Sequence, residues 1–371
     1  MNTEWIYSRL HLDRESGTPL ITQIVDGITW LIASGDLKAE EQLPPMRELA
    51  EHLEVHMHTV RQAYQRLEAD HLVSVRTRRG TVVLPYDPAV VAKRGAENPS
   101  HLIGVVLPNP GSFYTPFIQA IQEDSRELGY LPLFCYTFEN PFLVDTYFNQ
   151  LIARQVDGFI FVSIGPASLI EDPQSLDFFP PIVSVDVPDM PGYRILIDTE
   201  GAAYKVTRHL LEHGRKRIGL ITPPLEWPNV TPFYEGYQSA LEESGIDIQP
   251  ELIAGVEGYF EDYGRSGAEQ LLDQDHRPDA IIAATDTLAL GVKGVIQERG
   301  LSIPDDLALA GYNDIQAAAL IQPGLTTASI PAAEMGSLAV ATLQKLIAGK
   351  KPQKQTQVIS TQLVIRGSCG C

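Results

Sequence analysis

Residues 43–67 read LPPMRELAEHLEVHMHTVRQAYQRL, and this stretch decides how the N-terminal part of the chain folds. Two prolines open an amphipathic run over Met46–Leu53, and proline is favoured at the first turn of a helix. A tight turn over Glu54–His56 follows. Helical spacing then predicts a helix over Met57–Ala69 with a buried stripe formed by Val60, Ala63, Tyr64 and Leu67. Two helices joined in this way predict a helix-turn-helix, whose second helix can enter the major groove of DNA.

The segments on either side complete this domain. Residues 19–34 carry isoleucines and leucines at helical spacing before Gly35, which predicts a further helix. Downstream, Leu72–Val75 and Thr81–Leu84 flank the basic turn Arg76–Gly80, which predicts a hairpin. The order helix, short helix, turn, helix, hairpin is that of a winged helix-turn-helix, with the hairpin as the wing.

This domain resembles the bacterial GntR family, because three segments match that family in order and spacing after Gly35: Leu43–Ala50, Val55–Leu67 and Gly80–Val83. The resemblance implies that Arg47 and Arg61 contact phosphates or bases, and that Gly80 lies at the tip of the wing. Together with neighbouring outward-facing side chains, the candidate DNA-binding residues are Arg47, His56, Met57, His58, Thr59, Arg61, Gln62, Arg78, Arg79 and Gly80. Met57 stands where the family often has arginine, which leaves the base preference open. The alternative interpretation of Arg61 and Arg66 is a solvated helix face.

After a proline-containing linker over residues 85–100, the pattern changes to short apolar strands that alternate with helices. The expected strands are Leu102–Leu107, Leu131–Tyr136, Gly158–Val162, Ile182–Val185, Arg217–Ile221, Ala280–Ala283 and Leu307–Ala310. The expected helices are Phe117–Leu128, Val144–Arg154, Tyr204–His213, Tyr234–Ser244 and Leu288–Arg299. This alternation predicts an α/β fold with doubly wound parallel sheets, and residues 101–371 are long enough for two such units.

The body resembles the effector domain of the lactose/galactose repressor family, a relative of periplasmic sugar-binding proteins. The matching phrases follow one another along the chain: Ile103–Val106, Asp157–Ile160, Asp186, His209–Leu211, Arg217–Ile218, Gly236–Tyr237, Ala240–Leu241, Thr285–Asp286, Ala289–Gly291, Ile303–Asp306, Gly311–Asp314, Leu325–Thr327 and Glu334–Gly336. The resemblance implies a periplasmic-binding-protein type I body of two Rossmann-like lobes joined by three crossovers. We therefore expect a winged helix-turn-helix domain over 1–84, a linker over 85–100 and an effector-binding domain over 101–371. Lobe 1 is expected over about 101–197 and 327–350, and lobe 2 over about 200–323 and 352–371.

The resemblance also implies where an effector binds, which is in the cleft between the lobes. Its polyol-contacting positions are Asp186, Thr285, Asp286 and Asn313, with Phe113 and Tyr114 as an aromatic wall. Phe233 stands where the family usually has arginine, and Asn313 where it usually has aspartate, so the usual clamp on neighbouring hydroxyls is missing. We include Phe233 among the expected effector-binding residues.

Several of these residues have a structural alternative. Asp286 could cap the helix that starts at Thr287 or Leu288. The aromatic residues Trp227, Tyr259 and Phe260 are expected to pack within loops rather than to stack on a ligand. The three histidines His52, His56 and His58 lack the cysteine or carboxylate partners of a metal site, so no metal and no cofactor are expected. The tail Cys369–Cys371 is expected to be chemically idle.

Composition narrows the function classes. The formal charge of −19 argues against a protein coated in nucleic acid, although the basic segment with Arg76, Arg78 and Arg79 can still bind phosphate locally. We see no signal peptide and no apolar run that could span a membrane, so a cytoplasmic location is expected. No nucleophile with a catalytic base is recognisable, and no lysine has the setting of the pyridoxal-phosphate enzymes that some GntR heads are fused to. The chain is not expected to be an enzyme.

These observations lead to one interpretation with open alternatives. The chain is expected to be a transcription repressor that binds a palindromic double-stranded DNA operator as a homodimer. A small carbohydrate-like effector bound between the lobes would release it. The alternatives are an activator, or a regulator that responds to a nucleoside or another ligand that is not a sugar.

Overall fold

A computed structural model describes residues 4–14, 18–76, 80–87, 99–138, 140–162 and 179–371. The chain divides into two compact units. Unit 1 contains Met1–Asn109, Ser125–Val183 and Thr342–Pro352. Unit 2 contains Pro110–Asp124, Ser184–Ala341 and Gln353–Cys371. Among the helices of the described residues, none is long and apolar enough to cross a membrane.

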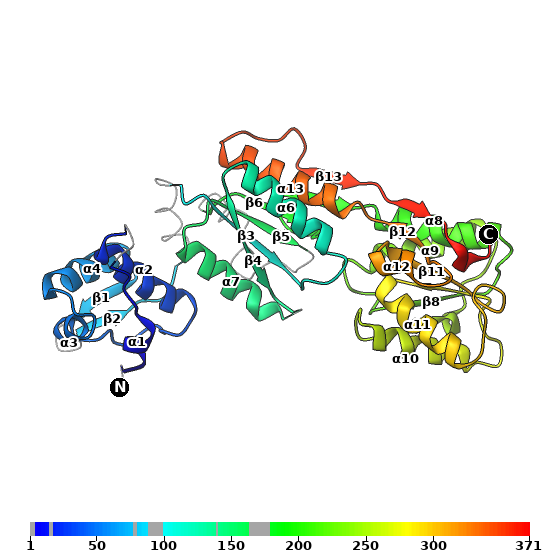
Figure 1. Cartoon of the computed structure of the whole chain (residues 1–371), viewed down its shortest axis with the longest axis horizontal. Helices are drawn as coiled ribbons and strands as arrows, with labels where there is room; N and C mark the ends of the chain where they lie inside the picture. Colours follow the sequence, from blue (N-terminus) through cyan, green and yellow to red (C-terminus); the bar gives the residue numbers. More distant parts are fainter. Residues whose placement is uncertain (1–3, 15–17, 77–79, 88–98, 139, 163–178) are drawn as a thin grey trace. The chain divides into compact units, whose positions relative to one another are not determined.

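The N-terminal part of unit 1 is a small helical domain with a hairpin, drawn in blue in Figure 1. Its helices are α1 (Glu4–Arg9), α2 (Leu20–Ala33), α3 (Met46–His52) and α4 (Met57–Ala69). The strands β1 (Val73–Arg76) and β2 (Gly80–Val83) pair antiparallel. The predicted winged helix-turn-helix is confirmed, and the expected stripe of α4 is buried: Val60, Ala63, Tyr64 and Leu67. The Tyr64 hydroxyl donates to the Pro44 carbonyl oxygen at 2.8 Å and so fixes α4 to the start of α3.

Helix α1 was not predicted, because six residues are too few to show a helical period. Its Ile6 and the following Leu10 are buried. Leu10 lies so close to α2 that a Cβ on Gly27 would come within 2.6 Å of it. The Tyr7 ring lies 4.7 Å from the His52 ring, so α1 also covers α3.

The first large sheet has the strand order β13-β7-β6-β5-β3-β4. Its strands are β3 (Leu102–Leu107), β4 (Leu131–Tyr136), β5 (Gly158–Val162), β6 (Ile182–Val185), β7 (Tyr193–Ile197) and β13 (Thr356–Ile359). β3 pairs in parallel with β4 and β5, and β13 in parallel with β7. The central strands β5 and β6 are buried along their whole length, as expected for a sheet covered on both faces.

The second sheet has the order β14-β12-β11-β10-β8-β9. Its strands are β8 (Ile218–Thr222), β9 (Ile253–Gly255), β10 (Ala280–Ala283), β11 (Ala308–Asn313), β12 (Thr326–Ser329) and β14 (Gln362–Val364). All are parallel to their neighbours except β14, which is antiparallel to β12. The order reverses at β8, which has β9 on one side and β10 on the other. In doubly wound sheets, ligands bind beyond the carboxyl ends of the strands at such a point.

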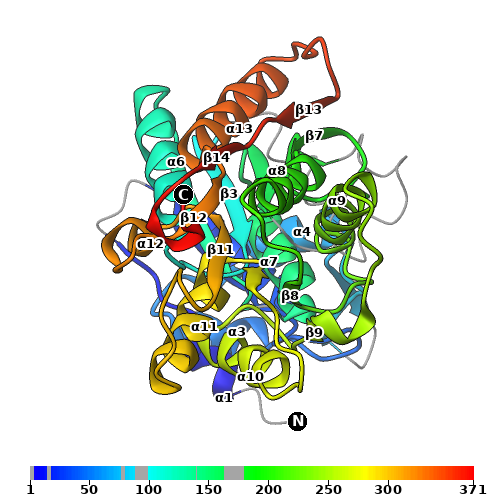
Figure 2. The ribbon, with the colours of Figure 1, turned by 90° about the vertical axis from the view of Figure 1, so that its right-hand side faces the viewer.

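Helices cover both sheets. Helix α7 (Pro141–Ala153) contacts β3 of the first sheet. Helices α6 (Thr115–Glu127) and α13 (Ala332–Ile347) run side by side (Figures 1 and 2). On the second sheet, α8 (Thr199–Glu212) pairs with α9 (Thr231–Glu243), and on the opposite face α10 (Glu261–Leu272) pairs with α11 (Asp286–Glu298). The short α12 (Gln316–Leu320) follows β11.

The chain changes sheet three times: after β7, after β12 and between β13 and β14. This number of crossovers is the one that the resemblance implied. Two strands lie outside the lobe ranges that we expected, because β12 belongs to the second sheet and β13 to the first. Both strands are short and lie beside a crossover, so their own residues do not indicate which sheet they join.

Candidate DNA-binding face and effector site

The recognition helix α4 presents one polar face. His58, Arg61, Gln62 and Gln65 are exposed, opposite the buried stripe, and Met57 is 42% exposed. Thr59 is half-buried. Arg61 and Gln62 make no side-chain hydrogen bond or ion pair with the described residues, whereas Arg66 lies 3.4 Å from the Thr22 hydroxyl. The face of α4 around Arg61 is therefore free to contact a ligand as large as DNA.

His56 has a local structural role. It is the N-cap of α4, and its Nδ1 accepts a hydrogen bond from the His58 backbone N–H at 3.1 Å. The His52 Nε2 lies 3.1 Å from the Tyr7 carbonyl oxygen. The side chains of these two histidines therefore bond to the protein itself. His56 acts on the DNA-binding face by capping the first turn of α4.

The other basic residues of this domain differ in availability. Arg47 is 84% exposed and pairs with Glu51 one turn later on α3 at 3.0 Å. Such an exposed pair contributes at most about 1 kcal/mol, so Arg47 can exchange its partner for a phosphate. Arg76 is bound by both carboxylate oxygens of Glu40, at 2.7 and 2.9 Å. We had counted Arg76 in the basic patch, but this bidentate pair neutralises it.

The wing tip lies only partly within the described residues. Gly80 is the first residue of β2 and has a φ of +70°, a conformation that favours glycine. Arg78 and Arg79 lie outside the described residues, so their DNA contacts stay a prediction.

Three of the expected effector residues, Thr285, Asp286 and Asn313, lie where the parallel strands β10 and β11 end. Thr285 follows β10 and is the N-cap of α11, where its hydroxyl accepts from the Leu288 N–H at 3.2 Å. We had considered that Asp286 caps a helix that starts at Thr287 or Leu288. Helix α11 instead begins at Asp286 itself. That alternative is wrong, because Thr285 provides the cap.

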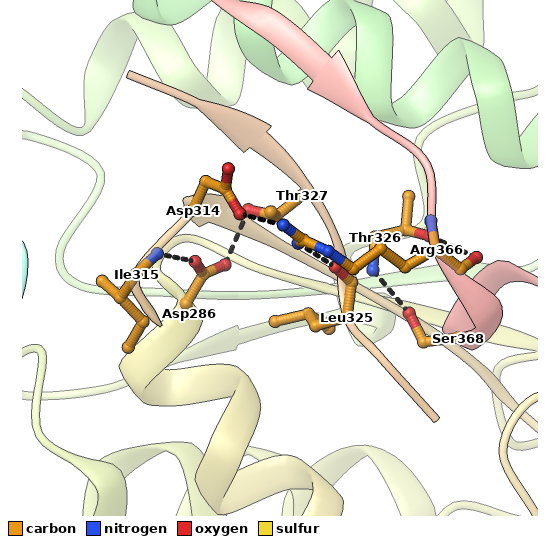
Figure 3. Close-up of polar contacts among 8 residues, drawn as sticks. All are labelled: Asp286, Asp314, Ile315, Leu325, Thr326, Thr327, Arg366 and Ser368. Atoms are coloured by element: carbon orange, nitrogen blue, oxygen red, sulfur yellow. Dashed lines mark hydrogen bonds and ion pairs between the residues drawn. The ribbon is translucent and has the colours of Figure 1, made fainter. Parts of the chain in front are cut away.

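Asp286 is nevertheless structural, as Figure 3 shows. Its side chain is fully buried and accepts from the Thr327 hydroxyl at 2.7 Å and from the Ile315 N–H at 2.8 Å. Burial raises the pKa of this carboxyl to about 7, while the hydrogen bonds from Thr327 and Ile315 act in the opposite direction. Asp286 joins the start of α11 to β12 and to the loop after β11, and this burial keeps it away from solvent and from a ligand.

The same loop is held by an ion pair. Arg366, near the end of the chain, donates to Asp314 at 2.6 Å and to the Leu325 carbonyl oxygen at 2.7 Å (Figure 3). Asn313 and Asp314 both have positive φ, at 110° and 57°. The turn after β11 is therefore fixed on both sides, and Asn313 is left half-buried at the strand end.

Tyr312 connects two more of the expected residues. Its ring lies 5.2 Å from that of Phe233, and its hydroxyl lies 3.1 Å from the Thr199 hydroxyl. Burial raises the pKa of Tyr312, and the charge of Asp186 raises it further. Phe233 is only 2% exposed, so it packs in the interior and does not present its ring to a ligand as we had expected.

Aromatic residues also follow strands of both sheets. Phe113 and Tyr114 are half-buried, with ring centroids 4.9 Å apart. Trp227, in the loop after β8, lies 6.0 Å from the ring of Tyr259, which follows β9. The Asn229 amide donates to the Tyr259 hydroxyl at 2.8 Å and fixes that ring. The sequence predicted loop packing for Trp227 and Tyr259, and their contact with each other is of that kind.

Comparison with known proteins now identifies the family. Residues 20–83 match the bacterial regulatory proteins of the gntR family, and residues 207–369 match a periplasmic binding protein-like domain. The chain is 32% identical over 295 residues to the HTH-type transcriptional repressor PurR of Pasteurella multocida, which covers 77% of this chain and 86% of that protein. A putative transcriptional regulator of the LacI family from Sanguibacter keddieii has the same fold, with 27% identity, a TM-score of 0.63 and coverage of 73% and 99%. This chain belongs to the LacI family of transcription regulators.

This LacI-family regulator combines a GntR-type DNA-binding domain with a periplasmic-binding-protein-like body, as the sequence predicted. The regulator is also 28% identical over 337 residues to the HTH-type transcriptional repressor CytR of Escherichia coli, which covers 89% of this chain and 98% of that protein. It is a DNA-binding transcriptional repressor with an effector domain. The polar face of α4 is the corresponding candidate DNA-binding surface.

Proposed function

We propose that this repressor is released from its operator by a small, sugar-like molecule that binds at the carboxyl edge of the second sheet. One observation carries the proposal: side chains able to bind a polar ring follow four adjacent parallel strands. Trp227 follows β8, Tyr259 follows β9, Thr285 follows β10 and Asn313 ends β11. Since the carboxyl ends of parallel strands meet at one edge, these residues share that edge.

The chemistry of this edge suits a pyranose. Aromatic side chains stack on the C–H face of a sugar ring, and an amide both donates to and accepts from hydroxyls. Asn313 offers that amide, and Asp186 is a half-buried carboxylate that directly follows β6. A nucleobase could also stack on the Trp227–Tyr259 pair, so a nucleoside is the second candidate.

We propose that the repressor acts as a homodimer on a two-fold-symmetric operator. A single DNA-binding module buries roughly 600–1,000 Å² of protein surface, whereas specific protein–DNA interfaces bury about 1,000–2,500 Å². One winged head is therefore too small for specific binding. We propose no catalytic activity for it, because the relatives that it matches are transcriptional repressors. Its target is genomic DNA, which places its action in the cytoplasm.

A thermal-shift screen of sugars, polyols and nucleosides tests the effector class. A binder at 100-fold its dissociation constant stabilises the native state by about 2.7 kcal/mol. The best binder should then release the repressor from its operator in a mobility-shift assay. We expect Asn313→Ala and Trp227→Ala to lose both the thermal shift and the release while they retain operator binding.

Phe260→Ala is the matched control, because Phe260 follows Tyr259 in the same loop but is 60% exposed. It should respond to the effector as the wild type does. If Asn313→Ala and Trp227→Ala also respond as the wild type does, the effector binds elsewhere and the proposal is wrong.

A further inference from the structure

Two cysteine sulfurs and one imidazole nitrogen meet near the C-terminal end of the chain. The ligating atoms of His209, Cys369 and Cys371 all lie within 4.8 Å of one another. The His209 Nε2 and the Cys371 Sγ are 3.1 Å apart, although the two residues are 162 positions apart in the sequence. Among the described residues, this is the one group of three metal-ligating side chains that lie so close together.

The fold holds two of these ligands firmly. His209 lies on α8 and is 6% exposed, and Cys369 lies in a short 3₁₀ turn and is 1% exposed. The Cys369 sulfur lies 3.2 Å from the Thr326 hydroxyl and 3.2 Å from the Arg366 carbonyl oxygen. The intervening Ser368 fixes the turn, because its hydroxyl donates to the Leu309 carbonyl oxygen and accepts from the Thr326 N–H.

Cys371 brings the third ligand. It is exposed and follows Gly370, whose φ of +85° turns the chain back toward α8. The His209 ring also packs against the His213 ring at 4.4 Å, and the His213 Nδ1 bonds the His209 carbonyl oxygen at 2.8 Å. These contacts orient α8 and its imidazole toward the tail.

We infer that His209, Cys369 and Cys371 form a binding site for a thiophilic divalent cation, with Zn²⁺ as the best fit. Ligand atoms on one tetrahedral zinc ion lie about 3.5–3.8 Å apart, because zinc–sulfur and zinc–nitrogen bonds are about 2.3 and 2.1 Å long. The His209 Nε2 and Cys371 Sγ are closer than that, at 3.1 Å, and no pair of the three atoms is more than 4.8 Å apart, so binding requires a shift that the exposed Cys371 can make. Two cysteines and one histidine leave a fourth position for water.

Binding would exchange protons for the metal. Each thiol gives up its proton to the solvent as its sulfur bonds to the cation, and the imidazole nitrogen binds in its neutral form. The bound ion would tie the last residues of the chain to α8 and, through the Cys369 turn, to β11 and β12. Sequence spacing alone did not show this site, because a Cys-x-Cys tail supplies two ligands and the third comes from a distant helix.

The test uses the full-length protein, reduced and freed of metal. Titration with Co²⁺ should give one equivalent of a thiolate-to-cobalt charge-transfer band, and Zn²⁺ should displace it. A competition with a chromophoric chelator gives the Zn²⁺ affinity. We expect Cys371→Ser and His209→Asn each to weaken Zn²⁺ binding by at least about 100-fold.

Cys135→Ser is the matched control, since Cys135 is a half-buried free thiol on β4, in the other sheet. It should bind the metal as the wild type does. Cys371→Ser is the decisive variant, because the Cys371 side chain is exposed and can be replaced without disturbing the fold. An unchanged unfolding midpoint in the absence of metal verifies this. No tight Zn²⁺ binding under reducing conditions, or equal affinity in Cys371→Ser and Cys135→Ser, would overturn the inference.

Discussion

Arg61 is the side chain on which the DNA-binding interpretation depends most. It is exposed on α4 opposite the buried stripe, and within the described residues it has no side-chain partner. We expect Arg61→Ala to weaken specific operator binding by roughly 1–3 kcal/mol, or about 5- to 150-fold, without lowering the unfolding midpoint. Arg208→Ala removes the same charge from an exposed position on α8 and is the control. Wild-type affinity of Arg61→Ala in a mobility-shift assay would show that α4 does not read the operator.

Asp286 makes stability depend on pH. Burial raises its pKa from 3.8 to about 7, so the folded chain holds this proton more tightly than the unfolded chain. Its contribution to stability is therefore complete below about pH 4 and is lost as the pH rises through about 7. We expect the wild type to lose up to ~4 kcal/mol relative to Asp286→Asn over this range, because asparagine does not titrate. Urea unfolding at several pH values measures the difference, and parallel pH profiles of the two proteins would contradict it.

At the scale of the elements, glycines allow the helices of the second sheet to pack closely. A Cβ on Gly291 of α11 would lie 2.0 Å from the Glu261 backbone oxygen of α10, so Gly291→Ala must push the two helices apart. We expect a loss of about 1–3 kcal/mol in the free energy of unfolding. Gly294 is the control on the same helix, since its Cβ would meet only the Arg265 guanidinium, at 2.8 Å. Gly294→Ala should be neutral or stabilising by up to about 1 kcal/mol, and equal losses in urea unfolding would refute this packing.

At the scale of the whole molecule, the two-headed operator complex can be tested by its stoichiometry. We expect sedimentation to show two protomers on one palindromic operator duplex. A duplex with a single half-site should bind at least about 100-fold more weakly. On the full operator the first bound head holds the second head at a high effective concentration near its half-site, and the single half-site lacks this contribution. A complex of one protomer on the full operator, or equal affinity for both duplexes, would rule out the homodimeric mode of binding.

The sequence by itself determined the elements whose signal is local. The helices α2, α3 and α4 and the wing hairpin follow from apolar period, proline and glycine positions, and a buried stripe that the structure reproduces. The central parallel strands were recognisable because strands covered on both faces are continuous apolar runs. The parallel strands β7, β9, β12 and β13 were not predicted. The family phrases added the order of these elements and the number of crossovers, which no single segment encodes.

Only the tertiary structure decided how individual polar and aromatic side chains are used. Asp286 and Phe233 stand at positions expected to contact a ligand, yet burial gives them structural roles. Arg76 is basic in the sequence, but Glu40 from another loop neutralises it. His209 and Cys371 come together only because α8 and the end of the chain pack on the same sheet. In each case the deciding partner is far away in the sequence, so hydrogen bonding, charge pairing and metal ligation at these residues depend on the folded arrangement and not on local pattern.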